Sequence, residues 1–338
     1  MDLNQKKNDV PVLKFQRVAK RFPNAQINAV NDVSFSVNRG DFITILGRSG
    51  SGKTTLLKMV NRIHEMTAGD IFFEGENIKN LNLQDYRRRV GYVIQQIGLF
   101  PHMTVAENIA TVPSVLKWEK TRIDTRVDVL LTLVGLDPAE YRNRYPGKLS
   151  GGQQQRVGLA RAMAAEPDLM LMDEPFGALD AITRQTLQDE LVKIQQKLNT
   201  TILFVTHDIQ EAFKLGDRVI IMDEGEIQQY ATPINILFEP ANDFVSQLVS
   251  AEDAVQKLKV LRAGAIASDL GFQTKSGDLR IDKDVYLDKV LARFFETRAE
   301  YFVVTGKDGQ PIGQISWEQF KNFAQFRKDG VDSKKEAV

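Results

Sequence analysis

The sequence predicts an α/β fold with a mainly parallel sheet, and two kinds of segment lead to this prediction. Short apolar runs at 42–46, 169–172 and 202–206 have the length and composition of strands buried on both faces. Amphipathic stretches at 54–63 and 181–198 have the spacing of helices. Because strands that alternate with helices favour a parallel sheet covered by helices, we expect an α/β domain over the first two thirds of the chain.

Further elements of this domain follow from local patterns. Residues 10–46 predict short strands joined by turns. Residues 104–136 have a helical pattern in two pieces, which we expect to be split near 113–119, where a proline stands. Strand patterns at 218–222 and 226–230 flank a Glu-Gly pair, which predicts a hairpin.

The pattern changes after about residue 245. Residues 255–328 combine helix patterns with strand patterns at 301–305 and 311–315, which are separated by a Lys-Asp-Gly turn. A helix pattern follows the second of these strands. This order is typical of a small α+β unit of the type β-α-β-β-α, so we predict two domains, 10–245 and 255–328.

Composition excludes several classes of protein. The 338 residues carry 44 Lys plus Arg and 44 Asp plus Glu, and this balance argues against a nucleic-acid partner. The chain has no Cys, which excludes disulfides and thiolate metal sites. No apolar run reaches the roughly 18 residues of a membrane span, and the first ten residues lack the apolar core of a signal peptide. We therefore expect a cytosolic protein that meets a membrane only through a partner.

A glycine-rich segment at 47–54 follows the first apolar run and matches the pattern G-x-x-x-x-G-K-[ST]. Its glycines let the backbone curl so that successive N–H groups point at phosphate oxygens. Lys53 is placed to reach the β- and γ-phosphates, and Thr54 can offer its hydroxyl to Mg²⁺. The segment predicts a nucleoside triphosphate site, whose candidate residues are Gly47, Ser49, Gly50, Ser51, Gly52, Lys53, Thr54 and Thr55.

Two acids end the apolar run at 169–172. Such a strand delivers Asp173 beside the phosphate loop, where it can hold Mg²⁺ through water. Glu174 is then near the γ-phosphate and can orient or deprotonate the attacking water. His207 follows the strand at 202–206 and could contact the γ-phosphate, although a single histidine is more often structural. From these residues alone, both interpretations of His207 stay open.

Residues 149–156, Leu-Ser-Gly-Gly-Gln-Gln-Gln-Arg, resemble the signature motif of the ABC ATPases. The resemblance covers roughly residues 11–240, with the motifs of that family in order. It implies an ABC-type P-loop NTPase fold, in which the parallel core sheet is joined by an antiparallel β subdomain and by a helical subdomain between Gln95 and Ser150. It also implies that the activity is ATP hydrolysis and that the cofactors are ATP and Mg²⁺.

The same resemblance implies roles for single residues. Phe22 would stack on adenine, and Gln95 would contact Mg²⁺ in the catalytic site, with Gln96 as the other candidate. His207 would be the switch histidine of the family. Asp180 matches a loop that crosses a dimer interface, and its position ahead of a helix also favours a role as N-cap.

The signature residues Ser150, Gly151, Gly152 and Gln153 begin a helix and so form a second anion-binding helix N-terminus. The resemblance implies that this N-terminus caps the γ-phosphate held by the opposite subunit of a homodimer, so that neither subunit completes a site alone. Closing and opening of the dimer would then drive a separate membrane protein.

Residues 90–105 resemble the importer branch that carries osmoprotectants such as glycine betaine, choline and carnitine. This implies integral membrane permease subunits as partners, a solute-binding protein as an indirect partner, and a peripheral position at the cytoplasmic face of the cell membrane. Residues 255–328 resemble a single CBS unit, in which Gln319 stands where the usual pattern has a ribose-binding acid. A regulatory role and a purely dimerising role therefore both stay open for this unit.

Three alternatives remain. A soluble ABC ATPase without a membrane partner usually carries long coiled-coil inserts or a second cassette, and this sequence has neither pattern. A P-loop kinase lacks the signature segment. An importer for another solute, such as an amino acid or a polyamine, shares every motif described here and is distinguished only by solute-binding measurements.

Overall fold

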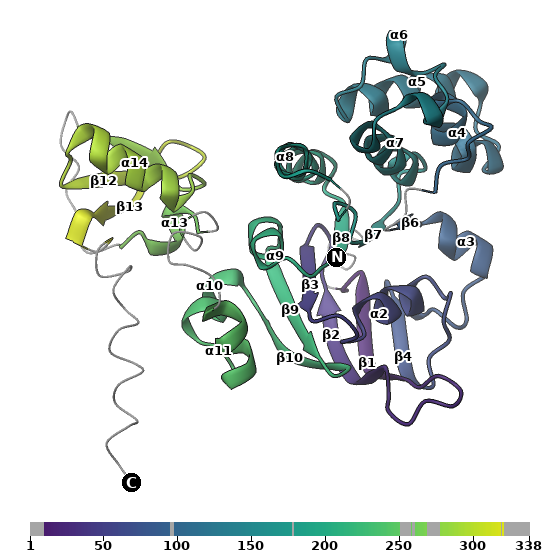
Figure 1. Ribbon diagram of the computed structural model, residues 1–338, viewed down its shortest axis with the longest axis horizontal. Helices are drawn as coiled ribbons and strands as arrows, with labels where there is room; N and C mark the ends of the chain where they lie inside the picture. Colours follow the sequence, from purple (N-terminus) through teal and green to yellow (C-terminus); the bar gives the residue numbers. More distant parts are fainter. Residues whose placement is uncertain are drawn as a thin grey trace, which may run out of the picture. The chain divides into compact units, whose positions relative to one another are not determined.

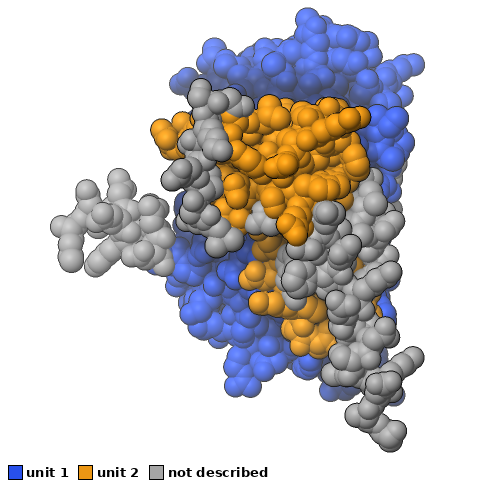
Figure 2. Space-filling model, turned by 90° about the vertical axis from the view of Figure 1, so that its left-hand side faces the viewer, with its two compact units in different colours: residues 1–232 blue, residues 233–338 orange. Residues whose placement is uncertain are grey.

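The computed structural model describes most of the chain and divides it into two compact units, residues 1–232 and 233–338, coloured blue and orange in Figure 2. The first unit ends earlier than the predicted boundary at 245, because the helices over 233–250 group with the second unit. Gln95, Gln96 and Gln319 lie outside the described residues. The described residues are 10–94, 98–177, 179–250, 258, 261–268, 278–318 and 320.

A six-stranded sheet forms the centre of the first unit (Figure 1). Five of its strands are parallel, and only the edge strand β10 runs antiparallel, as a hairpin with β9. The predicted parallel α/β fold is confirmed. In spatial order the strands are β10 (Glu226–Ala231), β9 (Arg218–Asp223), β3 (Phe42–Gly47), β8 (Thr201–Thr206), β7 (Leu169–Asp173) and β6 (Val90–Val93).

The core sheet separates two hydrophobic clusters. Along β7, Leu169 and Leu171 belong to one cluster, whereas Met170 and Met172 belong to the other. Successive side chains of a strand point to opposite faces, so this alternation means that both faces are covered. Helix α2 (Lys53–Val60) packs into the first cluster, and helix α8 (Ala181–Leu198) packs into the second.

A four-stranded antiparallel sheet shares the first cluster. Its inward side chains include Leu13 and Phe15, and the Phe15 ring stacks on Phe35 with 4.2 Å between centroids. The predicted antiparallel β subdomain is therefore present. Its strands, in spatial order, are β2 (Val30–Val37), β1 (Leu13–Lys20), β4 (Ala68–Phe73) and β5 (Glu76–Asn77), and helix α3 (Leu83–Arg88) follows them.

Helices gather in one part of the first unit and contribute to the second cluster (Figure 1). The expected break in the segment 104–136 is present, but Pro113 lies inside the first helix rather than at its end. A proline inside a helix removes the hydrogen bond to the carbonyl four residues earlier, here that of Ile109, and α4 ends two residues after Pro113. The helices are α4 (Val105–Val115), α5 (Lys120–Leu133), α6 (Pro138–Tyr141) and α7 (Gly151–Met163), with a 3₁₀ turn at Pro146–Lys148.

The second unit contains a three-stranded sheet of order β11-β12-β13, in which β11 and β12 are parallel. Phe294, Phe302 and Ile315 are in its core. The β-α-β-β order matches the prediction, whereas the likeness to a CBS unit stays a prediction. The elements are α10 (Pro233–Phe238), α11 (Asp243–Ser250), α13 (Ala263–Ile266), β11 (Arg280–Asp282), α14 (Leu287–Thr297), β12 (Tyr301–Thr305) and β13 (Pro311–Ser316).

The buried side chain of Asn108 ties the start of α4 to the loop before it. Its Oδ1 accepts from the backbone of Phe100 at 2.8 Å, and its Nδ2 donates to Phe100, Met103 and Thr104 carbonyls. We expect Asn108→Ala to lower the free energy of unfolding by about 2–3 kcal/mol, because buried backbone groups lose their partners. Urea unfolding measures this change. The exposed Asn80→Ala is the control, and equal stability of both variants would contradict the assignment.

Candidate active site

The phosphate loop at 47–54 joins β3 to α2, and its shape depends on glycine. A Cβ atom on Gly47 would lie 2.2 Å from the carbonyl oxygen of Met222. Gly52 has φ +97°, and a Cβ there would lie 2.2 Å from the carbonyl oxygen of Ala29. No other residue fits either position, so the sequence pattern corresponds to a real steric requirement.

Lys53 lies inside this loop and is only 6% exposed. Its Nζ donates to the carbonyl oxygens of Gly47 and Arg48, both at 2.8 Å. Burial lowers the pKa of the amine, and the nearby Glu174 and Asp173 oppose this effect. The loop therefore holds one desolvated cation at its centre, which is the charge that a triphosphate requires.

The Ser51 hydroxyl tests whether the loop fits a phosphate group. Its Oγ is buried and has no hydrogen-bond partner among the residues that the structure describes. An unpaired buried hydroxyl is costly, and a phosphate oxygen in the loop would satisfy it. The residues present therefore fit a bound triphosphate.

Thr54 and Asp173 form a candidate magnesium site. Thr54 Oγ1 donates to Asp173 Oδ1 at 2.9 Å, which joins the start of α2 to the end of β7. Burial raises the pKa of Asp173, and the hydrogen bond from Thr54 opposes that rise. Within the described ranges there is no cluster of three or more His, Cys, Asp or Glu side chains. This donor set fits Mg²⁺, which usually takes few protein ligands and completes its shell with water and phosphate oxygens.

Glu174 and His207 come together although 33 positions separate them in the sequence. His207 Nδ1 lies 3.2 Å from Glu174 Oε2. The Glu174 backbone N–H also donates to Val205 at 3.0 Å, and Glu174 has φ +44°, a left-handed conformation that is strained for this residue type. The end of β7 therefore fixes the carboxylate beside the histidine at the end of β8.

The signature segment forms a separate pocket of about 510 Å³ at the start of α7. Ser150 and Gln153 make a reciprocal capping box, with Gln153 N donating to Ser150 Oγ at 3.3 Å and Ser150 N donating to Gln153 Oε1 at 2.9 Å. Gln153 Nε2 also donates to the hydroxyl of Tyr141 at 3.1 Å. The pocket is lined by Gly135, Leu136, Tyr141, Ser150, Gly151, Gly152, Gln153, Arg156, Leu179, Asp180 and Thr183.

Asp180 is the N-cap of α8, which is one of the two roles expected for it; the other is in a loop that crosses a dimer interface. Its Oδ1 accepts from the backbone of Thr183 at 3.0 Å, and this hydrogen bond lowers the pKa of the carboxyl group. Because Asp180 also lines the signature pocket, capping does not remove it from the site.

Phe22 is partly exposed. A purely structural aromatic residue would be expected in the core, and Phe22 is not there. The His64 ring meets it edge-on with 5.2 Å between centroids, and Lys20 Nζ lies 5.1 Å from its centroid. Burial lowers the pKa of His64, with Lys58 and Lys20 adding to the effect. Sequence reasoning missed His64 and also Tyr141, since neither belongs to a recognisable motif.

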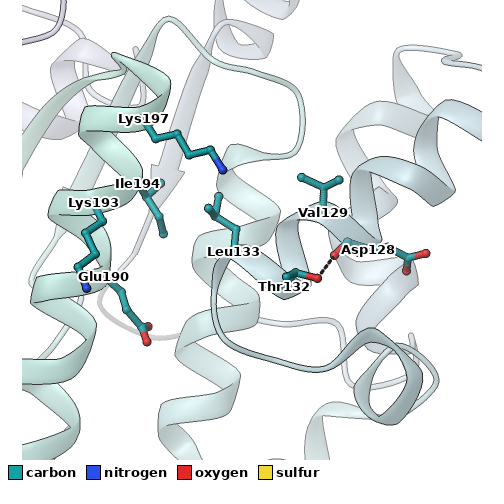
Figure 3. Close-up of a pocket in the computed structure, with 8 residues that line it drawn as sticks. All are labelled: Asp128, Val129, Thr132, Leu133, Glu190, Lys193, Ile194 and Lys197. Carbon is teal, nitrogen blue, oxygen red and sulfur yellow. Dashed lines mark hydrogen bonds between the residues drawn. The ribbon is translucent and has the colours of Figure 1, made fainter.

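Two further hollows in the first unit differ in their relation to the site. A groove of about 300 Å³ lies between β6 and α7, and its lining includes Tyr92 and Gly98. A hollow of about 590 Å³ lies between α5 and α8, and its eight residues include none of the predicted site residues (Figure 3).

Comparison with known proteins identifies the family. The family model described as ABC transporter matches residues 30–177. The glycine betaine uptake system ATP-binding protein YehX of Escherichia coli is 45% identical over 307 residues, which cover 91% of this chain and 98% of that protein. The glycine betaine/carnitine/choline transport ATP-binding protein OpuCA of Bacillus subtilis is 52% identical over 245 residues, 72% of this chain and 64% of that protein.

A solved structure supports the same assignment. The ATP-binding cassette MJ0796, in a dimeric post-hydrolysis state bound to ADP and Pi, is 31% identical, with a TM-score of 0.59. The aligned region covers 65% of this chain and 98% of the MJ0796 chain. Together with the phosphate loop, the paired acids and the signature helix, these matches show that the chain belongs to the ABC transporter family, as an ATP-hydrolysing subunit that uses ATP and Mg²⁺ and couples hydrolysis to transport.

Proposed function

We propose that this chain drives an importer of quaternary-amine osmoprotectants, acting as a homodimer on a separate membrane permease. The observation that carries the dimer is the separation of two half-sites. The pocket lined by Ser150, Gly151, Gly152 and Gln153 contains no residue of the phosphate loop. A second copy of the chain can bring its phosphate loop to this pocket, as the dimeric neighbour MJ0796 supports.

The chemistry at each interface follows from the site geometry. Lys53 and the loop N–H groups bind the phosphates, and Thr54 and Asp173 would hold Mg²⁺, which would neutralise charge on the phosphate oxygens. Gln95, the third predicted ligand, lies outside the described residues. Glu174 accepts a proton from the attacking water, and His207 fixes that carboxylate at 3.2 Å.

The Ser150 hydroxyl and the free N–H groups at the start of α7 cap the γ-phosphate of the partner subunit. The Ser150 Oγ already accepts from Gln153, so its hydrogen is available to donate to a phosphate oxygen. Phe22 provides the aromatic surface for adenine, and Asp180 faces the partner subunit beside the same pocket. Loss of the γ-phosphate then removes the contact that joins the two subunits.

The groove between β6 and α7 is the proposed docking site of the permease. Phe100 at its edge is 40% exposed, and Arg161 Nη1 donates to the carbonyl of Gly98 at 2.9 Å, which holds that wall in place. Arg87 and Arg88 add positive charge to the lining. No helix among the described residues is long and apolar enough to cross a membrane. The proposed position is peripheral, at the cytoplasmic face of the cell membrane, with a solute-binding protein as an indirect partner.

The proposed solute class rests on the relatives YehX and OpuCA, whose names specify glycine betaine, carnitine and choline. The solute itself is selected by other subunits, so an amino acid or a polyamine is the alternative. In a transporter assembled with its permease and receptor, glycine betaine should stimulate ATP hydrolysis, while methionine and spermidine should not. Stimulation by spermidine alone would favour the alternative.

Glu174→Gln should bind ATP as tightly as the unchanged chain but lose turnover by about 10²–10⁴-fold, because the amide cannot accept the proton from water. Single-turnover hydrolysis and equilibrium binding of ATP measure the two quantities. The exposed Glu76→Gln should retain full activity. Hydrolysis at the normal rate by the Glu174 variant would remove the base role.

Two inactive variants test the shared site directly. Ser150→Arg blocks the signature pocket, and Lys53→Ala disables the phosphate loop, so each should be inactive alone. In a mixture, half of the dimers combine both chains and have one intact site out of two, and we expect about a quarter of the normal ATPase activity. A mixture that stays as inactive as each variant, although mixed dimers form, would argue against sites shared between subunits.

A further inference from the structure

The turn that presents His207 is closed by its two neighbours. The backbone N–H of Asp208 donates to Thr206 Oγ1 at 3.0 Å, across the histidine. Such a side-chain bond fixes the peptide units on both sides of the enclosed residue. The direction in which His207 leaves the strand therefore depends on the orientation of the Thr206 hydroxyl.

Glu211 orients that hydroxyl. Its carboxylate accepts from Thr206 Oγ1 and, at 3.0 Å, from Gln188 Nε2, and the residue is only 6% exposed. Burial raises the pKa of Glu211, and both hydrogen bonds oppose the rise. A buried carboxyl group is costly unless its hydrogen bonds are made, so these contacts are required by the fold.

The role of Glu211 differs from what its position predicts. Asp208 is the N-cap of α9 (Ile209–Leu215), and its Oδ1 accepts from the Glu211 backbone at 3.0 Å. An acid at this third helical position ordinarily completes a capping box by accepting from the N-cap backbone N–H. Here that N–H is taken by Thr206, and the Glu211 carboxylate bonds to side chains outside α9. Helix capping thus leaves the carboxylate unexplained.

Gln188 can present only a donor to this carboxylate. Its Oε1 accepts from Lys214 Nζ at 3.3 Å, and Lys214 in turn pairs with Asp189 at 2.7 Å. The lysine fixes the oxygen end of the amide, so the nitrogen end points to Glu211. An amide in place of Glu211 would either set its nitrogen against the Gln188 nitrogen or, turned the other way, deprive the Thr206 hydroxyl of its acceptor.

Helix α8 therefore supports the turn from the side, next to α9 (Figure 1). A second contact comes from its first turn, where Arg184 lies 3.6 Å from Asp208 and donates to the carbonyl of Leu179 at 3.1 Å. Because Asp180 caps α8 and Thr183 in its first turn lines the signature pocket, the same helix contacts both that pocket and the histidine turn.

We propose that Glu211 is a positioning residue for ATP hydrolysis, which acts through Thr206 to hold the turn that places His207 against Glu174, and that Gln188 links this turn to helix α8. The inference rests on the proposed role of His207.

The test compares Glu211→Gln with the unchanged full-length chain in the transporter assembled with its permease. We expect the Kd for ATP to stay within about twofold, since the phosphate loop is untouched, and kcat to fall about tenfold or more. Glu296→Gln, which removes an exposed acid on α14, is the control for charge and should leave both quantities unchanged.

A reciprocal exchange separates positioning from general loss of structure. In the double variant Glu211→Gln with Gln188→Glu, the acid at position 188 can pair with Lys214 and accept a hydrogen bond from the amide nitrogen at position 211. The amide oxygen at position 211 can still accept from Thr206. We expect kcat to recover to within about threefold of the normal value. A double variant that folds, as thermal unfolding shows, but has no higher kcat than Glu211→Gln would overturn the inference.

Further variants make each failure distinguishable. If His207→Ala is inactive while Glu211→Gln has normal kcat, the positioning role is wrong and the proposed function stands. If His207→Ala is fully active, the proposed role of His207 fails first. If Glu211→Gln does not fold, Thr206→Val tests the proposal instead, and Thr206→Ser, which keeps the hydroxyl, is the matched control. Normal kcat in Thr206→Val contradicts the proposal. A lowered kcat with an unchanged Kd for ATP supports it.

Discussion

The parallel pairing of three buried strands determines where every charged group of the active site can lie. β3 pairs with β8, and β8 pairs with β7, so their carboxyl ends meet at one edge of the sheet. β3 leads into the phosphate loop, β7 ends at Asp173 and β8 ends at Thr206, ahead of His207. Their residues are buried. Residues more than a hundred positions apart are thus held within hydrogen-bonding distance, as Thr54 and Asp173 are at 2.9 Å.

This arrangement places opposite charges where water is scarce. Burial disfavours the charged forms of both Lys53 and Asp173, and the approach of Asp173 and Glu174 partly offsets the effect for the lysine. The amine is held by carbonyl oxygens, and the Ser51 hydroxyl is left without a partner among the described residues. A site of this kind is already shaped for a triphosphate and a divalent cation, so little reorganisation is needed when they bind.

Much of this architecture could be predicted from the sequence because it depends on local patterns. The helix at 181–198 and the hairpin after 218 have the predicted bounds or nearly so, since apolar spacing and a Glu-Gly turn specify them. The continuation of α4 two residues past Pro113 could not be predicted, because a proline inside a helical pattern ordinarily marks a break.

Contacts between elements were less predictable than the elements. The resemblance implied a switch histidine at His207 but not its approach to Glu174, because that contact depends on the register of β7 against β8. The role of Glu211 had no signal in the sequence, since Asp208 and Glu211 look like an ordinary capping box. In the folded chain the acid bonds instead to Thr206 and Gln188.

The left-handed backbone at Glu174 has a consequence for how this protein can change over evolutionary time. A non-glycine residue at φ +44° costs on the order of 1–2 kcal/mol, which glycine would relieve. Selection for thermostability alone would therefore drive this position toward glycine, and selection for turnover would drive it back. A lineage that no longer needed its ATPase would be expected to lose the glutamate early, and to become more stable in doing so.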